Sequence, residues 1–527
     1  MPLGRRLVRV VLTAAATLLV AAPSASAIDP VDTSALRDAV TVNGILRHER
    51  ALQGIANMNG GTRVAGSPGH TASAAYVKGR LESAGYTVRE QAFEFPFFQE
   101  LAAPALSRTA PTPKDYVADT DVATLEYSGS GNVTAPLVPV DLVLPPGPTA
   151  NSNTSGCETA DWANFPRGAI ALVQRGTCTF QIKVANAEAA GAVGIILFNE
   201  GTPGAPDRNG LPAVTLGRPF TIPALGATFA VGNELAALAA AGPVEVHMTA
   251  STLSETRTTT NVLGDTPGGD ASETVVVGAH LDSVSEGPGI NDNGSGSATQ
   301  LAIAEAMNRL KIEPRRKIRF AFWSAEEQGL LGSEHYVSAL SPEALGDIYA
   351  NINSDMLASP NYVRFVYDGD GSAGPPAGPP GSDVIESVFT RYFAGQGLAT
   401  TPTDFDGRSD YGPFIAVGIP AGGLFSGAEG IKTAAEAAEY GGTEGEPYDP
   451  CYHQACDTMT NLNTRALREL GDGTAHAVGT LALSRSGLYE DSSLTSRSAK
   501  ARASRSSKSR KKHRVRRLEF RGPLAIR

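Results

Sequence analysis

The chain has 527 residues, too long for one ordinary domain, and its length predicts about three structural units. Its composition, 42% hydrophobic and 19% charged, is typical of a globular protein with a substantial buried core. The net charge of −10 is uneven: residues 496–527 carry thirteen Lys or Arg and one Glu, whereas residues 28–495 carry −25. The acidic body argues against nucleic-acid binding by the folded part. We expect residues 491–527 to form a disordered basic tail, because dense like charge with few apolar residues cannot bury enough surface.

The N-terminus has the pattern of a secretory signal peptide. Arg5, Arg6 and Arg9 precede an apolar run, and small residues end at Ala27, where we expect cleavage. The alternative is a membrane anchor, but the run is shorter than the roughly 20 residues that a span needs. We therefore interpret residues 1–27 as a signal peptide and the mature protein as secreted, with no membrane span. The paired arginines leave the export route open.

The four cysteines form two sequence-local pairs, which an exported protein can oxidise. We expect the disulfides Cys157–Cys178 and Cys451–Cys456, the simplest of the three possible connectivities. A cysteine zinc site is the alternative, but no Cys-x-x-Cys spacing supports it.

The first part of the folded chain, residues 28–127, has the alternation typical of an α/β domain. Apolar spacing predicts helices over 45–58 and 70–83, each closed by glycine, and alternation predicts a strand over 86–95. Helix, helix and strand in this order are a common beginning of α/β peptidase domains.

Residues 128–250 differ in texture and indicate a separate small α/β unit. A Ser-, Gly- and Pro-rich stretch leads to buried-strand runs at 168–173 and 191–199, with a helix predicted over 180–190 between them. The patterns Gly-Ala-Ile-Ala-Leu-Val-x-Arg-Gly and Ala-Gly-Ala-x-Gly-Ile-Ile resemble the protease-associated domain, an insert of exported peptidases. We expect this insert to lie over the cleft of the surrounding domain.

The α/β rhythm resumes in residues 251–490. Strands are predicted over 274–279 and 317–323, with an amphipathic helix over 298–310 between them and another helix from about Ser324. This alternation predicts an α/β fold with a central mixed, mostly parallel sheet and helices on both faces. Ligands of such sheets bind at the carboxyl ends of the strands.

Candidate metal ligands occur at five separate places, most of them after predicted strands. They are His280, Asp292, Glu327, Asp355 and His453. A single Asp after a strand is usually a turn residue or helix cap, and paired glutamates usually complement a helix dipole. The prediction therefore rests on the whole set, because two imidazoles and three carboxylates suit a pair of Zn²⁺ ions.

The segments around these ligands carry a family resemblance. They are His280-Leu281-Asp282, Asn291-Asp292-Asn293-Gly294-Ser295-Gly296, Ala325-Glu326-Glu327-Gln328-Gly329, Asn353-Ser354-Asp355-Met356, Ser359-Pro360-Asn361, Gly407-Arg408-Ser409-Asp410-Tyr411 and Cys451-Tyr452-His453. Together they resemble the zinc aminopeptidases of the aminopeptidase S and aminopeptidase Y type, which are related to glutamate carboxypeptidase II. The ligands that the resemblance implies are His280 and Asp355 for one zinc ion, Glu327 and His453 for the other, and Asp292 as the bridge.

The resemblance also implies roles for residues around the metals. Asp282 is expected to orient the first histidine ligand, since metal-bound histidines usually donate their other N–H to a carboxylate or carbonyl. Glu326 is expected to be general base and then acid, and Tyr452 to stabilise the oxyanion. Arg408 is expected to fix the substrate, and Phe425 to contribute to the pocket for its side chain.

The function that follows is hydrolysis of the N-terminal residue, expected to be apolar, from peptides with a free amine. A carboxypeptidase or a glutaminyl cyclase of the same fold is an alternative, although the insert argues against the cyclase. A non-catalytic binding ectodomain is another alternative, which the complete ligand set disfavours. The basic tail is either solvated without a partner or a contact to anionic cell-wall polymer.

Overall fold

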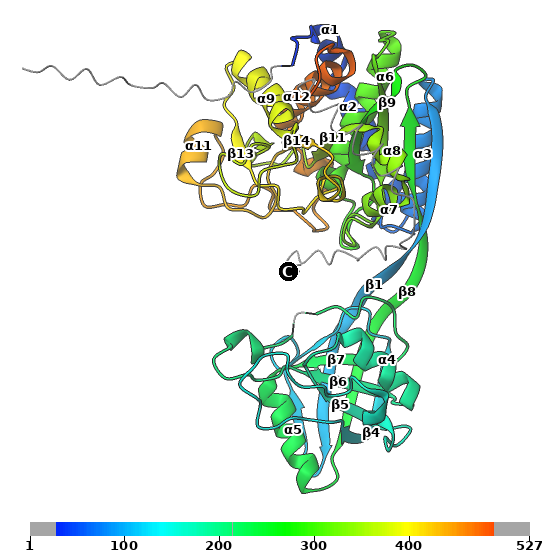
Figure 1. The fold of residues 1–527 in the computed structure, drawn as a ribbon, viewed down its shortest axis with the longest axis vertical. Helices are drawn as coiled ribbons and strands as arrows, with labels where there is room; N and C mark the ends of the chain where they lie inside the picture. Colours follow the sequence, from blue (N-terminus) through cyan, green and yellow to red (C-terminus); the bar gives the residue numbers. More distant parts are fainter. Residues whose placement is uncertain (1–27, 213, 490–527) are drawn as a thin grey trace, which may run out of the picture.

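The computed structural model of the protein describes residues 28–489 except residue 213. The expected signal peptide and the basic tail with its wall contact lie outside this range. The described residues form a larger body from the outer parts of the chain and a smaller body from the middle, and a two-stranded ribbon joins them (Figure 1). Among residues 28–489, no helix has the length and apolar character needed to cross a membrane.

The larger body contains a mixed sheet whose centre is parallel. Its strands in spatial order are β13 (Thr401–Thr403), β12 (Phe365–Tyr367), β14 (Ala421–Phe425), β11 (Ile348–Asp355), β9 (Asp270–His280), β10 (Arg316–Trp323) and β8 (Glu245–Asp265). The central strands β14, β11, β9 and β10 are parallel, whereas β12 and β8 pair antiparallel at either side of them. The mixed, mostly parallel sheet predicted from the sequence is thus confirmed.

Helices cover both faces of this sheet because its central strands are apolar on both sides. The first face carries α1 (Ser34–Ala39), α2 (Val42–Met58), α3 (Pro68–Ser83), α6 (Gly296–Arg309), α9 (Ser382–Gly395) and α12 (Thr464–Leu483). The second carries α7 (Leu331–Ala339), α8 (Pro342–Gly346) and α10 (Gly412–Ala416), while α11 (Ala434–Tyr440) packs beside β12. Along β9, Val275 and Val277 pack into the first core and Val276 into the second, as the twofold alternation of a strand requires.

The smaller body has its own sheet and its own apolar cores. Its strands are β3 (Val122–Thr124), β4 (Gly131–Pro139), β5 (Ile170–Gln174), β6 (Gly194–Phe198) and β7 (Ala224–Ala227), and its helices are α4 (Phe180–Ala190) and α5 (Phe229–Ala241). Strand β3 pairs with β7, so the sheet of this body includes residues before 128, the boundary expected from the sequence. The short strand β2 (Lys114–Tyr116) pairs with β1.

The two bodies are joined by β1 (Thr87–Ala110) and β8, which pair antiparallel along almost their whole length. Strand β8 leaves the insert and enters the larger body, where β10 runs antiparallel to it. The carboxyl ends of β10, β9, β11 and β14 therefore point toward the insert. The insert stands away from them at the end of the ribbon (Figure 1), rather than directly over the cleft as expected from the sequence.

Gly232 provides a test of how the insert is packed. A Cβ added at Gly232 on α5 would lie 1.9 Å from the ring carbon Cγ of Phe198 on β6, so the helix would have to move away from the sheet. We expect Gly232→Ala to lower the free energy of unfolding by about 1–3 kcal/mol. The matched control is Gly79→Ala on α3, where a Cβ meets nothing within 4 Å. Urea denaturation followed by circular dichroism measures both, and a Gly232→Ala protein as stable as the Gly79→Ala protein would contradict this packing.

Candidate metal centre and active site

The structure brings all five expected metal ligands together at the carboxyl edge of the sheet. His280 is the last residue of β9, and Asp355 is the last residue of β11. Asp292 lies in the short irregular helix η3 (Ile290–Ser295) just before α6, Glu327 in the turn after β10, and His453 in the loop between α11 and α12. Parallel neighbouring strands end at the same edge, and this is why residues far apart in sequence meet here.

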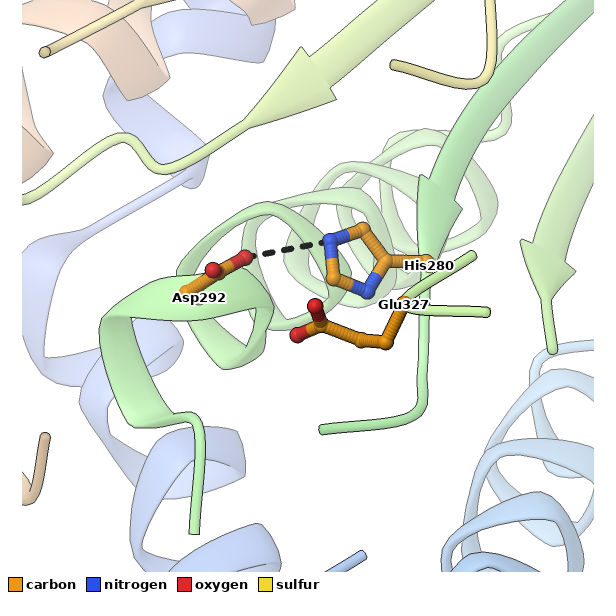
Figure 2. Close-up of side chains that lie close together, drawn as sticks. All are labelled: His280, Asp292 and Glu327. Carbon is orange, nitrogen blue, oxygen red and sulfur yellow. Dashed lines mark ion pairs between the residues drawn. The ribbon is translucent and has the colours of Figure 1, made fainter. Parts of the chain in front are cut away.

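Asp292 occupies the centre of the group, with one oxygen toward each histidine. Its Oδ1 lies 3.2 Å from Nε2 of His280 (Figure 2), and its Oδ2 lies 3.3 Å from Nε2 of His453. The same nitrogen of His280 is 3.3 Å from Oδ1 of Asp355, and that of His453 is 3.0 Å from Oε2 of Glu327. The donor atoms therefore form two clusters that share the carboxylate of Asp292.

The donor chemistry fits divalent metal ions. Ligand atoms of His280, Asp292 and Glu327 lie within 4.8 Å of one another, as do those of His280, Glu326 and Asp355. Together with His453, these residues hold four carboxylates and two imidazoles. Three of their buried atoms have no hydrogen-bond partner in the described residues: Nδ1 of His280, Oε1 of Glu327 and Oδ1 of Asp355. Imidazole and carboxylate donors with excess negative charge are a combination that suits Zn²⁺.

Burial and mutual repulsion shift the pKa values of these groups strongly. Burial lowers the pKa of His453, but Glu327 and Asp292 beside it outweigh burial and raise it to about 11. Burial raises the pKa of Glu327 to about 7, and the charge of Asp292 adds to this effect. The pKa of Glu326 is also well above its ordinary value, because of burial and the nearby carboxylates of Asp410 and Glu327. Carboxylates this crowded stay ionised only beside compensating positive charge.

Asp282, which is expected to orient His280, lies beside that histidine and also contacts the paired glutamates. Its Oδ1 lies 3.7 Å from Nδ1 of His280, beyond ordinary hydrogen-bond distance. Its carboxylate also accepts hydrogen bonds from the backbone N–H groups of Glu326 and Glu327, at 3.3 and 3.4 Å.

The helix predicted from about Ser324 is wrong: residues 324–330 form a turn, and α7 starts at Leu331. Asp282 holds this turn.

Two side chains that hold expected ligands in position were not predicted from the sequence. Ser409 donates its hydroxyl to Oδ2 of Asp355, an expected ligand. Asp457 accepts the backbone N–H groups of Asn291 and Asp292, at 2.8 and 2.9 Å, and so fixes the segment that carries Asp292. Ser409 stands in a motif that the sequence singled out, but no periodic pattern indicates which side chain a serine hydroxyl will reach.

The remaining expected site residues lie around the metal ligands. The Tyr452 ring stacks on that of His453, with centroids 3.8 Å apart. The half-exposed Arg408 pairs with Glu429 at 2.8 Å. Phe425, the last residue of β14, stacks on Phe365 with centroids 5.9 Å apart.

Both sequence-local disulfides are present. Cys451–Cys456 closes the loop that carries Tyr452 and His453, and Cys157–Cys178 lies in the insert.

A further acidic cluster, formed by Asp368, Asp370 and Glu386, lies outside this site and forms hydrogen bonds within its own segment of the chain. Asp368 accepts backbone N–H groups from Ser372 and Ala373, and Glu386 accepts one from Gly369. These hydrogen bonds account for the clustering of Asp368, Asp370 and Glu386.

The sequence is similar to known proteins over most of its length. Residues 261–478 match the model of peptidase family M28, and residues 133–235 match that of the PA domain. An aminopeptidase of Pseudomonas aeruginosa (strain UCBPP-PA14) is 45% identical over 469 residues, which are 89% of this chain and 86% of that protein. A probable leucine aminopeptidase 2 of Aspergillus oryzae (strain ATCC 42149 / RIB 40) is 38% identical over 449 residues, 84% of each chain.

A solved structure has a similar fold. The aminopeptidase from Aneurinibacillus sp. strain AM-1 has a TM-score of 0.59 and 26% identity, over 87% of this chain and 97% of that one. The chain therefore belongs to peptidase family M28 and carries a PA domain. The resemblance inferred from the motifs is confirmed.

The short disulfide gives a prediction about the site. Closing the few residues between Cys451 and Cys456 adds little to the entropy difference between folded and unfolded chains. We therefore expect Cys451→Ser/Cys456→Ser to lower peptidase activity markedly while changing the melting temperature little. The matched control is Cys157→Ser/Cys178→Ser, which opens a longer loop away from the metal ligands and should do the reverse. Equal losses of activity in the two double variants would contradict this role.

Proposed function

We propose that the chain is a secreted aminopeptidase that binds two Zn²⁺ ions and hydrolyses the N-terminal residue from peptides. The observation that carries the proposal is the position of Asp292, whose two oxygens face two separate histidine and carboxylate clusters. His280 and Asp355 would hold one ion, Glu327 and His453 would hold the other, and Asp292 would bridge them. When bound, the ions lower the pKa of a water molecule and polarise the scissile carbonyl.

Glu326 is the group proposed to move protons. Its carboxylate is 3.9 Å from Nε2 of His280, and its neighbour Glu327 would hold metal. A pKa raised by burial and by Asp410 brings this carboxyl closer to the working pH, which improves a general base that must later act as an acid. We propose that Glu326 takes a proton from the attacking water and delivers it to the leaving amine.

Tyr452 and Arg408 are the groups proposed to stabilise the oxyanion and fix the substrate. Burial and the nearby carboxylates of Asp292 and Glu327 raise the pKa of Tyr452, so its phenol stays protonated and able to donate a hydrogen bond. Arg408 keeps its charge at any working pH and is steadied by Glu429. Donors at the carbonyl oxygen act on charge that develops only in the transition state.

The proposed specificity has two parts. The excess of carboxylates favours a substrate that presents a free ammonium group, which supports exopeptidase action at the amino end. The half-buried ring of Phe425, stacked on Phe365, supports an apolar first residue. Relatives named leucine aminopeptidase agree with this preference.

Secretion and the domain limits are part of the same proposal. Two disulfides suit an oxidising compartment outside the cytoplasm. We propose 1–27 as the signal peptide and an insert that starts at β2 (Lys114–Tyr116), earlier than residue 128, and ends at residue 250, with peptidase parts on either side of it up to residue 490. We propose that the basic tail, residues 491–527, is either solvated or in contact with anionic wall polymer.

Chelation tests the reaction and the metal together. Purified protein should cleave leucyl anilides, and it should not cleave the N-acetylated forms, because an acetyl group removes the ammonium. Exhaustive chelation should abolish turnover, and Zn²⁺ should restore it. Good turnover of blocked substrates, release from the carboxyl end, or full activity in metal-free protein would each refute the proposal.

Glu326→Gln tests the proton transfer separately from metal binding. The amide keeps the size of the side chain but cannot accept a proton, so kcat should fall by at least about 10²-fold. Zinc content should stay at the wild-type level, because the ligand atoms are unchanged. Glu334→Gln, on the exposed side of α7, is the matched control and should have wild-type kcat. An unchanged kcat in the Glu326→Gln protein would remove this residue from the mechanism.

A further inference from the structure

Arg63 is a buried charged side chain for which the proposed reaction has no role. It lies in the loop between α2 and α3, and none of its surface is exposed. Its guanidinium donates to three backbone carbonyls: Nε to Pro288 at 2.9 Å, Nη2 to Gly289 at 2.6 Å, and Nη1 to Leu281. The backbone N–H of Arg63 donates to the hydroxyl of Ser283 at 2.9 Å.

All of these acceptors belong to the chain segment between two metal ligands. Leu281 directly follows His280, and Gly289 precedes Asp292 by three residues. The guanidinium of Arg63 thus forms hydrogen bonds to the backbone just after β9 and to the backbone just before Asp292. Arg63 precedes the insert in sequence, and its acceptors follow the insert by more than thirty residues.

The charge of Arg63 has no ion-pair partner within 4.0 Å among the described residues, yet acids surround it. Asp282, Glu49, Asp457 and Asp292 all act on its guanidinium at longer range. Burying a charge without a direct partner is unfavourable, and an apolar residue of similar volume would usually be tolerated better. A guanidinium, however, presents its N–H donors in a rigid planar fork that can satisfy three fixed carbonyls at once, a geometry that the three rotatable donors of an ammonium do not have.

We infer that Arg63 is a positioning residue of the zinc centre: its guanidinium fixes the separation between His280 and Asp292 by bonding the carbonyls of Leu281, Pro288 and Gly289. The inference rests on the proposed function, because it concerns binding of the proposed ions. Arg63 acts through the backbone and reaches neither the ligand atoms nor the substrate. Partners of this kind outside the ligand set typically change metal affinity by about 10–100-fold.

Arg63→Lys tests this role with a matched control. Lysine keeps the positive charge but lacks the fork, so the loss reports geometry rather than charge. The control is Arg316→Lys: Arg316 is also buried, also donates to backbone carbonyls, those of Leu481 and Ser484, and starts β10 at the opposite end of the sheet. Zinc affinity is measured by competition with a chromogenic chelator at a temperature well below unfolding, beside the melting temperature of the zinc-free proteins.

We expect zinc affinity to fall about 10–100-fold in the Arg63→Lys protein and to stay within a few-fold of wild type in the Arg316→Lys protein. Both substitutions should lower the melting temperature of the zinc-free protein, because both leave buried carbonyls without donors. Equal zinc affinities in the two variants would overturn the positioning role and leave Arg63 as a structural residue only.

Arg63→Gln decides the question if the Arg63→Lys protein is not recovered folded. Its uncharged amide has two N–H donors, so it cannot supply all three carbonyls that the guanidinium bonds. A clear loss of zinc affinity is expected, and an unchanged affinity would overturn the inference. Wild-type protein that binds no zinc would refute the proposed function instead, so the two failures are distinguishable.

Discussion

The arrangement of the site depends on one electrostatic constraint, the concentration of buried negative charge at the carboxyl edge of the sheet. Asp292, Glu326, Glu327 and Asp355 meet two imidazoles there, and Asp282 and Asp410 lie fully buried behind them. Ionised carboxylates in such an environment repel one another and lose hydration, which is why burial and neighbouring acids raise the pKa of Glu327 and Glu326. Divalent ions would relieve this repulsion.

The rest of the larger body keeps these charges at fixed distances. Parallel strands deliver His280 and Asp355 to one edge, and the carboxylate of Asp282 holds the turn of the paired glutamates by its backbone N–H groups. Asp457 accepts hydrogen bonds from backbone N–H groups of the segment that carries Asp292, and Arg63 donates to a backbone carbonyl of the same segment. Most of these contacts use backbone groups, so the ligand geometry is set by the shape of the loops as much as by the ligands.

Much of this fold could be predicted from the sequence because the patterns are local. Apolar runs such as 274–279 and 317–323 identify buried strands without knowledge of their neighbours. The strand predicted over 86–95 from alternation is longer in the structure, where β1 continues to Ala110 along β8. The sequence beginning at Ser324 is typical of a helix start, but tertiary hydrogen bonds to Asp282 hold a turn there instead.

Some residues of the site could likewise be predicted from local sequence, and others could not. The clustering of the five expected ligands could be predicted because several chemically matched residues follow strands within recognisable motifs. Arg63 and Ser409 could not, because their role lies in contacts with residues more than 50 positions away, and nothing in the local sequence encodes such a partner.

The central claim is that Asp292 is shared by two metal ions, and anomalous X-ray diffraction at the zinc edge tests it most directly. Crystals of the zinc-loaded protein should show two anomalous peaks, one contacted by His280 and Asp355 and the other by Glu327 and His453, with one oxygen of Asp292 at each. A single peak, or two peaks of which only one contacts Asp292, would contradict the account.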